Sequence, residues 1–289
     1  MAKESFETYR PLLFSIAYRM LGSAMDAEDI VQEAYLRYQK MPPDSIESPK
    51  AFLGTMVTRL CLNQLDSARA RREGYIGPWL PEPVLTGPDA LASSPASLLH
   101  QRESISIAFL VLLENLTPAE RTVFLLREVF DYPYAEIAPI VGKTESTCRQ
   151  LFSRAKRHIA AHRPRFETSP EEHARILGGF MRAVEGGELE PLTDILAEDV
   201  TLWADSDGKI RGAITRPIFG RDAVIRFMGG IRHFAPEGAV VEMPEVNGGP
   251  AAILRYASGA PFVVVTCTVN DGHIQALHIV GNPDKLKLV

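Results

Sequence analysis

The chain has 289 residues, of which 46% are hydrophobic and 23% charged, and its formal net charge is −5. This composition is ordinary for a folded protein of two or three domains and excludes collagen-like, disulfide-rich and disordered classes. Cys61, Cys148 and Cys267 lie far apart without a CxxC pair, so we expect no disulfide, metal or cofactor and a reducing compartment. The start lacks the pattern of a signal peptide and no apolar run is long enough for a membrane span, which favours a cytoplasmic protein.

The charge is unevenly distributed along the chain. Residues 1–169 carry equal numbers of basic and acidic side chains, whereas residues 170–289 carry the whole net charge of −5. Positions 143–165 contain seven basic residues and one acidic residue, Glu145. Because the local field governs attraction to phosphate, this segment is a candidate for contact with nucleic acid.

Residues 5–73 show the periodicity of three helices. The first has apolar residues at i, i+3 and i+4 spacing, and Gly22 and Ser23 end it. Asp26 is placed to cap the second helix, which opens with acidic residues. After a proline-containing loop, a third helix is predicted from about residue 49 to 72. We therefore expect an all-α domain over residues 1–73.

The rest of the chain divides into a linker, a second helical domain and a mixed domain. Residues 74–96 contain five prolines and three glycines, which is typical of an extended linker. Helical periodicity resumes over residues 97–165. Residues 166–289 begin with two predicted helices, 173–185 and 189–196. Strand patterns follow at 200–204, 240–242, 251–257, 262–269 and 273–280, and they predict an α+β fold with a curved antiparallel sheet.

The segment from Thr117 to Ile159 has the signals of a helix-turn-helix. Thr117 and Glu120 form a predicted capping box, and Gly142 ends a short helix that begins near residue 134. A longer basic helix follows, and its exposed face is expected to meet DNA. The candidate residues are Lys143 and Thr144 at the helix start and Arg149, Gln150, Ser153, Arg154 and Arg157 along it. The alternative is an ordinary helical hairpin with a solvated basic face.

Two segments together resemble a known family. The sequence DAEDIVQEAYLRY, residues 26–38, resembles the helix of sigma factor region 2 that docks on the clamp helices of RNA polymerase, and the helix-turn-helix resembles region 4. The order is that of extracytoplasmic-function sigma factors, in which a linker replaces region 3. The resemblance implies a non-enzymatic subunit that binds core RNA polymerase and promoter DNA and directs transcription initiation.

The resemblance also assigns roles to individual residues. It implies core polymerase contacts by residues of the second helix: Asp26, Asp29, Gln32 and Glu33. It places the minus-ten DNA element near Lys50, Arg59 and Asn63, and the minus-35 element on the basic helix. From the residues alone, the acidic helix start and Arg59 have a second interpretation as solvated surface charges.

The remaining motifs resemble the subgroup of these sigma factors that carries a fused SnoaL-like (NTF2-like) domain. Its linker motif stands here as Trp79, Leu80, Pro81, Glu82 and Pro83, and its C-terminal motif as Asn282, Pro283, Asp284, Lys285 and Leu286. A third motif, DGGGR, appears as Asp207, Gly208, Lys209, Ile210 and Arg211, with two glycines replaced. The resemblance implies regulation in cis, through a clasp between linker and C-terminal domain, without a separate anti-sigma factor. A stiff spacer is the alternative.

The C-terminal domain has candidates for a pocket. SnoaL-like folds form a cone with a pocket between helices and sheet, and some relatives are enzymes that use an Asp or a His. Trp203, Asp205 and His278 are the candidates here, but their spacing identifies no acid–base pair. We therefore expect no catalysis and leave open an unidentified small-molecule ligand.

Two other functions compete with the sigma factor interpretation. A one-component repressor would combine a helix-turn-helix with a ligand-binding domain and would dimerise on a palindrome without a polymerase-docking helix. A cyclase-like or isomerase-like enzyme could instead carry a DNA-binding appendage. A pull-down with core polymerase separates the first from a sigma factor, and turnover assays separate the second.

Overall fold

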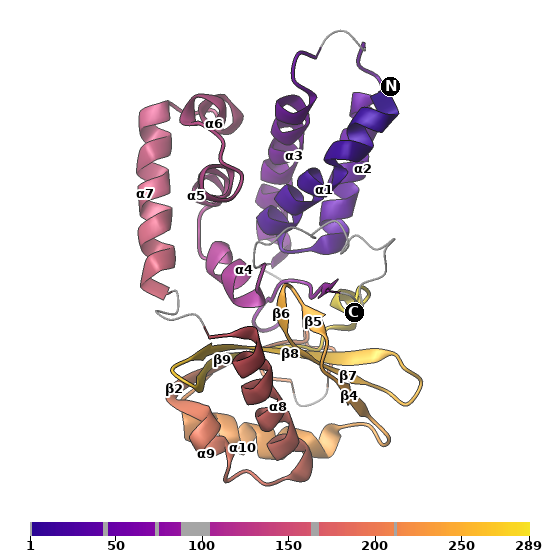
Figure 1. Ribbon diagram of the computed structural model, residues 1–289, viewed down its shortest axis with the longest axis vertical. Helices are drawn as coiled ribbons and strands as arrows, with labels where there is room; N and C mark the ends of the chain where they lie inside the picture. Colours follow the sequence, from indigo (N-terminus) through magenta and orange to yellow (C-terminus); the bar gives the residue numbers. More distant parts are fainter. Residues whose placement is uncertain (1, 43–45, 73–74, 88–104, 163–167, 211–212) are drawn as a thin grey trace. The chain divides into compact units, whose positions relative to one another are not determined.

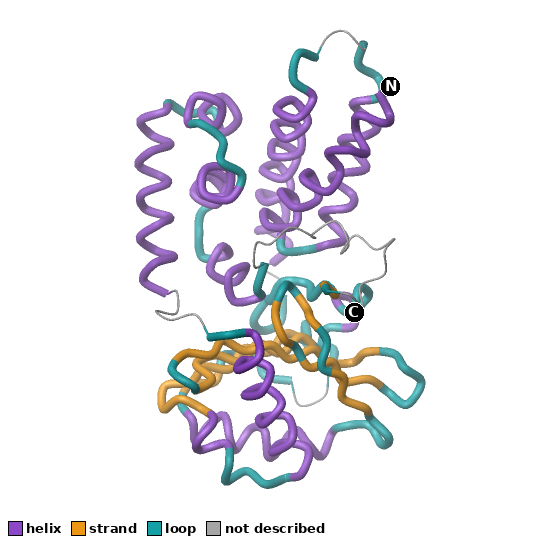
Figure 2. The backbone as a smooth tube through the Cα atoms, viewed as in Figure 1, coloured by secondary structure: helices purple, strands orange, loops and turns teal. Residues whose placement is uncertain are grey.

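The computed structural model describes residues 2–42, 46–72, 75–87, 105–162, 168–210 and 213–289. These residues form two compact units (Figure 1). The first unit consists of residues up to 72 and from 109 to 162, and the second consists of linker residues 75–87, residues 105–108 and residues 168–289. Helices dominate the first unit, and the strands lie in the second (Figure 2).

The N-terminal helices follow the predicted pattern. They are α1 (Ala2–Leu21), α2 (Ala24–Tyr38) and α3 (Pro49–Arg72), and α1 ends at Gly22, which has a left-handed φ of 68°. The predicted cap of α2 was wrong: Ser23 is the N-cap, and its hydroxyl accepts the N–H of Asp26 at 3.1 Å. Asp26 lies in the first turn, where a carboxylate interacts favourably with the positive end of the helix dipole.

The second helical segment is the predicted helix-turn-helix. It contains α4 (Ile107–Glu114), α5 (Pro118–Phe124), a π-helical turn (Leu125–Val129), α6 (Tyr134–Val141) and α7 (Glu145–His162). The capping box of Thr117 and Glu120 is present. Gly142 adopts φ 64°, which closes α6 with a left-handed C-cap, and the Thr144 hydroxyl accepts the N–H of Thr147 at 3.2 Å. Cys148 of α7 packs with Ile137 of α6 in a small apolar core.

The second unit is built on a six-stranded sheet. Its strands are β2 (Leu196–Asp205), β3 (Ile218–Phe219), β4 (Val240–Glu242), β7 (Ala252–Arg255), β8 (Pro261–Asn270) and β9 (His273–Val280). Their order is β3-β2-β9-β8-β7-β4. The sheet is mixed and not purely antiparallel as predicted, because β2 runs parallel to β9 with Leu202 opposite Leu277. This parallel pairing joins the first and last long strands, so local sequence patterns could not reveal it.

Helices α8 (Pro170–Gly186), α9 (Leu192–Ile195) and α10 (Arg221–Ile231) cover one face of this sheet (Figure 1). Phe180, Val224 and Met228 from the helices share a buried core with Leu202 and Leu277. Helix α10 was not predicted, although Val224, Phe227, Met228 and Ile231 recur at helical spacing; its two adjacent glycines weaken the local signal. Together the two helical regions and this α+β unit confirm the expected fold class.

The linker contributes a strand to the second unit. A small sheet of order β1-β5-β6 contains β1 (Leu85–Thr86), β5 (Glu245–Val246) and β6 (Gly249–Pro250). Leu85 pairs with Val246, and the Leu85 N–H also donates to the carbonyl of Leu288 at 3.2 Å. Residues 75–87 therefore fold with the C-terminal part of the chain.

In the described segments of the chain, none of the helices has the length and apolar character needed to cross a bilayer.

Candidate functional site: a linker clasp and two binding faces

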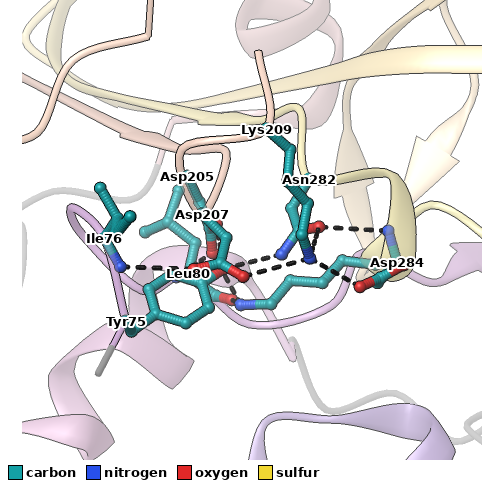
Figure 3. Close-up of polar contacts among 9 residues, drawn as sticks. Tyr75, Ile76, Leu80, Asp205, Asp207, Lys209, Asn282 and Asp284 are labelled. Atoms are coloured by element: carbon teal, nitrogen blue, oxygen red, sulfur yellow. Dashed lines mark hydrogen bonds and ion pairs between the residues drawn. The ribbon is translucent and has the colours of Figure 1, made fainter. Parts of the chain in front are cut away.

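Asp205, at the end of β2, is the centre of a buried polar cluster. Its side chain is enclosed, and the residue is only 1% exposed. The carboxylate accepts hydrogen bonds from the hydroxyl of Tyr75, from the N–H of Leu80 at 2.7 Å and from the ammonium of Lys285 at 2.7 Å (Figure 3). Two of these three donors belong to the linker, so Asp205 fixes the linker to the sheet. We call Tyr75, Leu80, Asp205, Asn282 and Lys285 the clasp.

Lys285 lies in the short 3₁₀ turn Pro283–Lys285 near the C-terminus and is 7% exposed. Besides Asp205, its ammonium donates to the carbonyl of Leu80 at 2.5 Å. It also lies 4.0 Å from the centroid of the Trp79 ring, within the range of a cation–π interaction. A buried charge is tolerated only when it is fully partnered. These contacts provide such partners, and the linker supplies two of them.

Asn282 connects the C-terminal turn to the same linker. Its amide donates to the Tyr75 hydroxyl at 2.8 Å, and its side-chain oxygen accepts the N–H of Asp284 at 3.2 Å. Burial, followed by the hydrogen bond to Asp205, raises the pKa of Tyr75 above its ordinary value. Tyr75 therefore remains a neutral phenol that donates to a carboxylate and accepts from an amide.

The altered glycine-rich motif forms the outer edge of the clasp. Asp207 and Gly208 have left-handed φ values of 50° and 68°, and the Asp207 carboxylate accepts the N–H of Ile76 at 3.3 Å. The Lys209 ammonium lies beside the carboxylates of Asp207 and Asp284 (Figure 3), at N–O distances of 3.1 Å and 2.7 Å. These hydrogen bonds raise the pKa of Lys209, and Lys209 in turn lowers the pKa of Asp284. The replacement of a glycine by lysine thus adds an exposed ion pair, while Arg211 lies outside the described residues.

Most of the linker motif is buried within the second unit, and Trp79 is half-buried there. Leu80 and Val84 have no exposed surface, Pro81 and Pro83 are buried, and Glu82 is nearly so. The Val84 N–H donates to the Asn247 side chain at 2.9 Å, and the Val84 carbonyl accepts the Asn247 N–H at 2.9 Å. Prolines suit this segment because they restrict the unbound chain and reduce the entropy lost on docking.

The second unit also contains a cavity of about 820 Å³ between helices and sheet. Ala204, Val265 and Ile279 line it from the sheet, and the segment around Asp205 forms part of its rim. Two residues that were predicted to line the pocket, Trp203 and His278, are not among the residues that line this cavity. They are register partners one position away from Ala204 and Ile279, so their side chains lie on the opposite face of the sheet.

His278 is 5% exposed, and burial lowers its pKa to about 4. Within the described part of the chain, its Nδ1 atom has no hydrogen-bond partner. Asp205 is engaged by Tyr75, Leu80 and Lys285. The two residues therefore do not form an acid–base pair around the cavity.

The candidate polymerase face lies on α2. Asp29, Gln32 and Glu33 are exposed along one side of the helix, whereas Asp26 is half-buried at its start. Leu36 follows on the same side with 49% of its surface exposed. The Glu33 carboxylate pairs with Arg37 at 2.5 Å. An acidic surface with an exposed leucine is suited to a basic partner that also offers apolar area.

The candidate minus-ten residues lie on or beside α3. Lys50, Arg59 and Asn63 are all exposed, while part of the preceding loop, residues 43–45, lies outside the described residues. The Arg59 guanidinium donates to the carbonyl of Pro139 in α6 at 2.9 Å. Side chains of α3 and α6 together line a hollow of about 700 Å³ that includes Arg59 and Asn63. In this state Arg59 is bonded to the helix-turn-helix.

Five candidate minus-35 residues lie on the outer side of α7, and the other two directly precede the helix. Lys143, Thr144, Arg149, Gln150, Ser153, Arg154 and Arg157 are all exposed. Arg149 pairs with Glu145 at 2.9 Å and lies over the Tyr134 ring, and Arg157 donates to the carbonyl of Ser153 at 3.4 Å. For Lys143, Gln150 and Arg154, the described residues supply no hydrogen-bond or ion-pair partner. The exposed side of α7 therefore offers cationic and amide groups of the kinds that pair with phosphates and base edges.

Comparison with known proteins identifies the two helical segments. Residues 5–71 match the family model "Sigma-70 region 2", and residues 106–159 match "Sigma-70, region 4". The chain is 40% identical over 298 residues to the ECF RNA polymerase sigma factor SigJ of Mycobacterium tuberculosis, and the match covers 99% of this chain and 93% of SigJ. The chain belongs to the family of extracytoplasmic-function (ECF) sigma factors.

Two further relatives support the same assignment over the whole length. The probable ECF RNA polymerase sigma factor SigI of M. tuberculosis is 32% identical, with 98% of this chain and 93% of SigI covered. The crystal structure of M. tuberculosis SigJ is similar with a TM-score of 0.77 and 36% identity, covering 98% of this chain and 97% of that chain. The similarity to SigJ therefore includes the C-terminal α+β unit.

As an ECF sigma factor, the protein binds core RNA polymerase and promoter DNA and directs transcription initiation. It is not an enzyme, and this assignment resolves the two competing interpretations, a one-component repressor and a cyclase-like enzyme. Region 2 corresponds to the α1–α3 segment, and region 4 contains the helix-turn-helix.

Three residues of this ECF sigma factor contact the linker or belong to it without any sequence signal for that role. Tyr75 precedes the recognised linker motif, Asn247 lies in a turn with φ 54°, and Asp205 was predicted as a pocket residue. The alternation of Trp203 and Asp205 indicates that they share a face of β2. It does not reveal that this face meets the linker, because the linker reaches it from about 125 positions away.

Proposed function

We propose that the C-terminal unit regulates this ECF sigma factor in cis by holding the linker between regions 2 and 4. On this proposal the protein needs no separate anti-sigma factor, and it acts in the cytoplasm, where polymerase and promoters are found. The observation that carries the proposal is the buried Asp205 carboxylate, which binds Tyr75 and Leu80 of the linker and Lys285 of the C-terminal turn.

The clasp acts at the start of the linker. Tyr75 follows the last residue of α3, Arg72, by three positions. The hydrogen bonds from Tyr75 and Leu80 to Asp205 therefore restrain the chain directly after region 2. The linker is otherwise the flexible connection that lets regions 2 and 4 reach separate DNA elements.

The two DNA elements cannot be reached while regions 2 and 4 remain packed together. The minus-ten and minus-35 elements are separated by roughly 25 base pairs, or about 85 Å of duplex. In the first unit, however, α3 packs against α5 and α6, and Arg59 is bonded to the carbonyl of Pro139. Promoter binding therefore requires the two regions to separate. We propose that the clasped linker favours the packed state and that its release favours the separated state.

The residue assignments within regions 2 and 4 belong to the same proposal. Asp26, Asp29, Gln32 and Glu33 are proposed to contact core polymerase, and Lys50, Arg59 and Asn63 to contact the minus-ten element. The exposed residues of α7, with Lys143 and Thr144 at its start, are proposed to contact the minus-35 duplex. Exposure of all of these side chains except the half-buried Asp26 supports the assignments.

The test is promoter-specific run-off transcription with core polymerase at limiting sigma factor. Asp205→Asn keeps the side-chain shape but removes the negative charge that Lys285 and Tyr75 bind, so we expect several-fold more transcript than from the wild type. Asp199→Asn, on the exposed side of the same strand, is the matched control and should leave the yield unchanged. Tyr75→Phe is a milder second variant in case Asp205→Asn is poorly folded. Equal yields from the folded clasp variants and the wild type would overturn the proposal.

A further inference from the structure

The cavity of the second unit and the clasp share one wall. At the end of β2 and just after it, Ala204, Ser206 and Ile210 line the cavity together with Asp205, whose carboxylate also holds the linker. The C-terminal segment repeats this arrangement. Gly281, Pro283 and Leu286 line the cavity, whereas Asn282 and Lys285 bond to Tyr75, Leu80 and Asp205. A molecule in the cavity would thus touch residues adjacent to Asp205, Asn282 and Lys285.

We propose that this cavity binds an apolar molecule bearing a carboxylate and that the bound ligand tightens the clasp on the linker. This inference deepens the proposed regulation in cis and rests on it for its biological role. The binding site itself rests on the geometry of the second unit.

The size and lining of the cavity fit an apolar ligand. Its volume of about 820 Å³ lies within the range of small-molecule sites. Met181, Val184, Phe227, Val265 and Ile279 supply an apolar interior. At the surface the lining includes large apolar side chains that remain exposed to solvent: Phe234 is 56%, Tyr256 46% and Ile210 37% exposed. Exposed apolar side chains around a cavity are typical of a binding site.

Arg232 supplies the charged contact. It belongs to the lining, and its guanidinium lies against Gly187, where a Cβ atom would come within 1.4 Å of Nη1. Among the described residues we find no hydrogen-bond or ion-pair partner for this guanidinium. A guanidinium keeps its charge at all physiological pH values and binds carboxylates through two parallel hydrogen bonds. The other cation near the rim, Lys209, is already paired with Asp207 and Asp284.

The acidic residues of the lining affect how strongly the cavity should bind an anionic ligand. Asp205 is neutralised by Lys285, which leaves Glu185 as the exposed acidic group of the lining. Glu185 opposes an anionic ligand, so its removal should strengthen binding where removal of Arg232 weakens it. A neutral ligand of the same length should respond to neither change.

Because the cavity and the clasp share a wall, ligand binding and linker docking are thermodynamically coupled. Ile210 packs so closely on the C-terminal segment that a Cβ atom on Gly281 would lie 2.6 Å from its Cδ1 atom. On the linker side, Ile76 packs on Gly208. A ligand that contacts Ile210 and Leu286 therefore stabilises the two segments that grip the linker. By reciprocity, the factor by which the ligand strengthens the clasp equals the factor by which clasp formation strengthens ligand binding, so a variant that opens the clasp should bind the ligand more weakly.

The test uses dodecanoate as the probe, with dodecanol as its neutral counterpart, and the intact protein. The chain has two tryptophans, so Trp203→Phe leaves Trp79 as a fluorescence reporter at the clasp. We expect saturable dodecanoate binding that changes Trp79 emission. Arg232→Gln should weaken dodecanoate binding at least 5-fold, Glu185→Gln should strengthen it, and neither should alter dodecanol binding. Absence of saturable binding, or equal affinities of the wild type and Arg232→Gln, would overturn the ligand assignment.

The coupling is tested with a substitution outside the cavity. Tyr75→Phe removes a clasp hydroxyl that is not part of the lining, and we expect about 5-fold weaker dodecanoate binding. Tyr9→Phe in region 2 is the matched control. Equal dodecanoate affinity in Tyr75→Phe and Tyr9→Phe would overturn the coupling. Since no polymerase is present, this result is independent of the transcription test, and either can fail while the other succeeds.

Discussion

Arg121 of α5 donates a hydrogen bond of 2.6 Å to the main-chain carbonyl of Met20 in α1, and this contact joins regions 2 and 4 within the first unit. Arg121 is only 3% exposed and also donates to the carbonyl of Leu113 at 2.9 Å and to Glu114 at 2.6 Å. The packed state of the two regions is thus held by a buried cation as well as by apolar contacts.

Replacement of this cation should destabilise the first unit. Arg121→Met removes the donor and leaves Glu114 and two carbonyls without their partner, so we expect a loss of about 3 kcal/mol in the free energy of unfolding. Urea denaturation followed by circular dichroism measures it. Arg154→Met, at an exposed position without a partner among the described residues, is the stability control and should change the free energy by less than about 0.5 kcal/mol. A similar small loss in Arg121→Met would contradict the role of Arg121.

The linker should be protected from hydrogen exchange as long as the clasp is intact. The N–H groups of Leu80, Val84 and Leu85 donate to Asp205, Asn247 and Leu288. Tyr75→Phe deprives Asp205 and Asn282 of a partner, which should cost about 1.4 kcal/mol and speed exchange of the linker about tenfold. Mass spectrometry of a peptide covering residues 75–86 measures this rate. Unaltered exchange in Tyr75→Phe would show that the hydroxyl does not hold the linker.

The buried imidazole of His278 should make stability depend on pH. Burial holds its pKa at about 4 in the folded protein, whereas an unfolded histidine has a pKa of about 6.5. Since the folded pKa is the lower one, the contribution of His278 is fully present above pH 6.5 and is lost as pH falls towards 4. The shift corresponds to about 3 kcal/mol.

Comparison with His278→Gln isolates this contribution from other titrating groups. Between pH 7 and pH 4 the wild type should lose about 3 kcal/mol more unfolding free energy than the variant, as measured by urea denaturation at several pH values. Parallel pH profiles of wild type and variant would contradict the lowered pKa of His278.

Two exposed residues of the helix-turn-helix should affect promoter binding in different ways. Lys143, at the start of α7, is suited to a phosphate, so Lys143→Ala should weaken holoenzyme binding equally for all minus-35 sequences and reduce the salt slope by about 0.9. Gln150 lies on the exposed face, and its amide can read a base edge, so Gln150→Ala should cost about 1–3 kcal/mol at one base pair only. Titrations of promoter fragments at several salt concentrations distinguish the two. A uniform loss in Gln150→Ala would assign Gln150 to the DNA backbone.

The helical regions could be predicted because their signals are local. Gly142 requires a left-handed C-cap, and Thr117 with Glu120 specifies a helix start within four residues. The sequence also located the linker motif and the C-terminal motif that contribute to the clasp. Their side-chain partners were not predictable from composition or spacing.

The chemistry of the clasp depends on contacts between distant segments. The sequence predicted Asp205 as a pocket residue, and Asp205 does line the cavity. Its carboxylate, however, binds Leu80 and Lys285, which are 125 and 80 positions away. Tyr75 had no motif of its own, and the parallel pairing of β2 with β9 is equally non-local. The periodicity of a strand identifies its two faces but not what covers each face.

The central claim is that Asp205 and Lys285 act as one unit that restrains transcription. Its most direct test is the run-off transcript yield of Asp205→Asn, of Lys285→Met and of the double variant, with Lys287→Met as the control for an exposed lysine of the same segment. If both residues act through the clasp, each single variant raises the yield and the double variant gives no more than the larger single effect. A double variant whose yield is the product of the two single effects, or single variants with wild-type yield, would contradict the account.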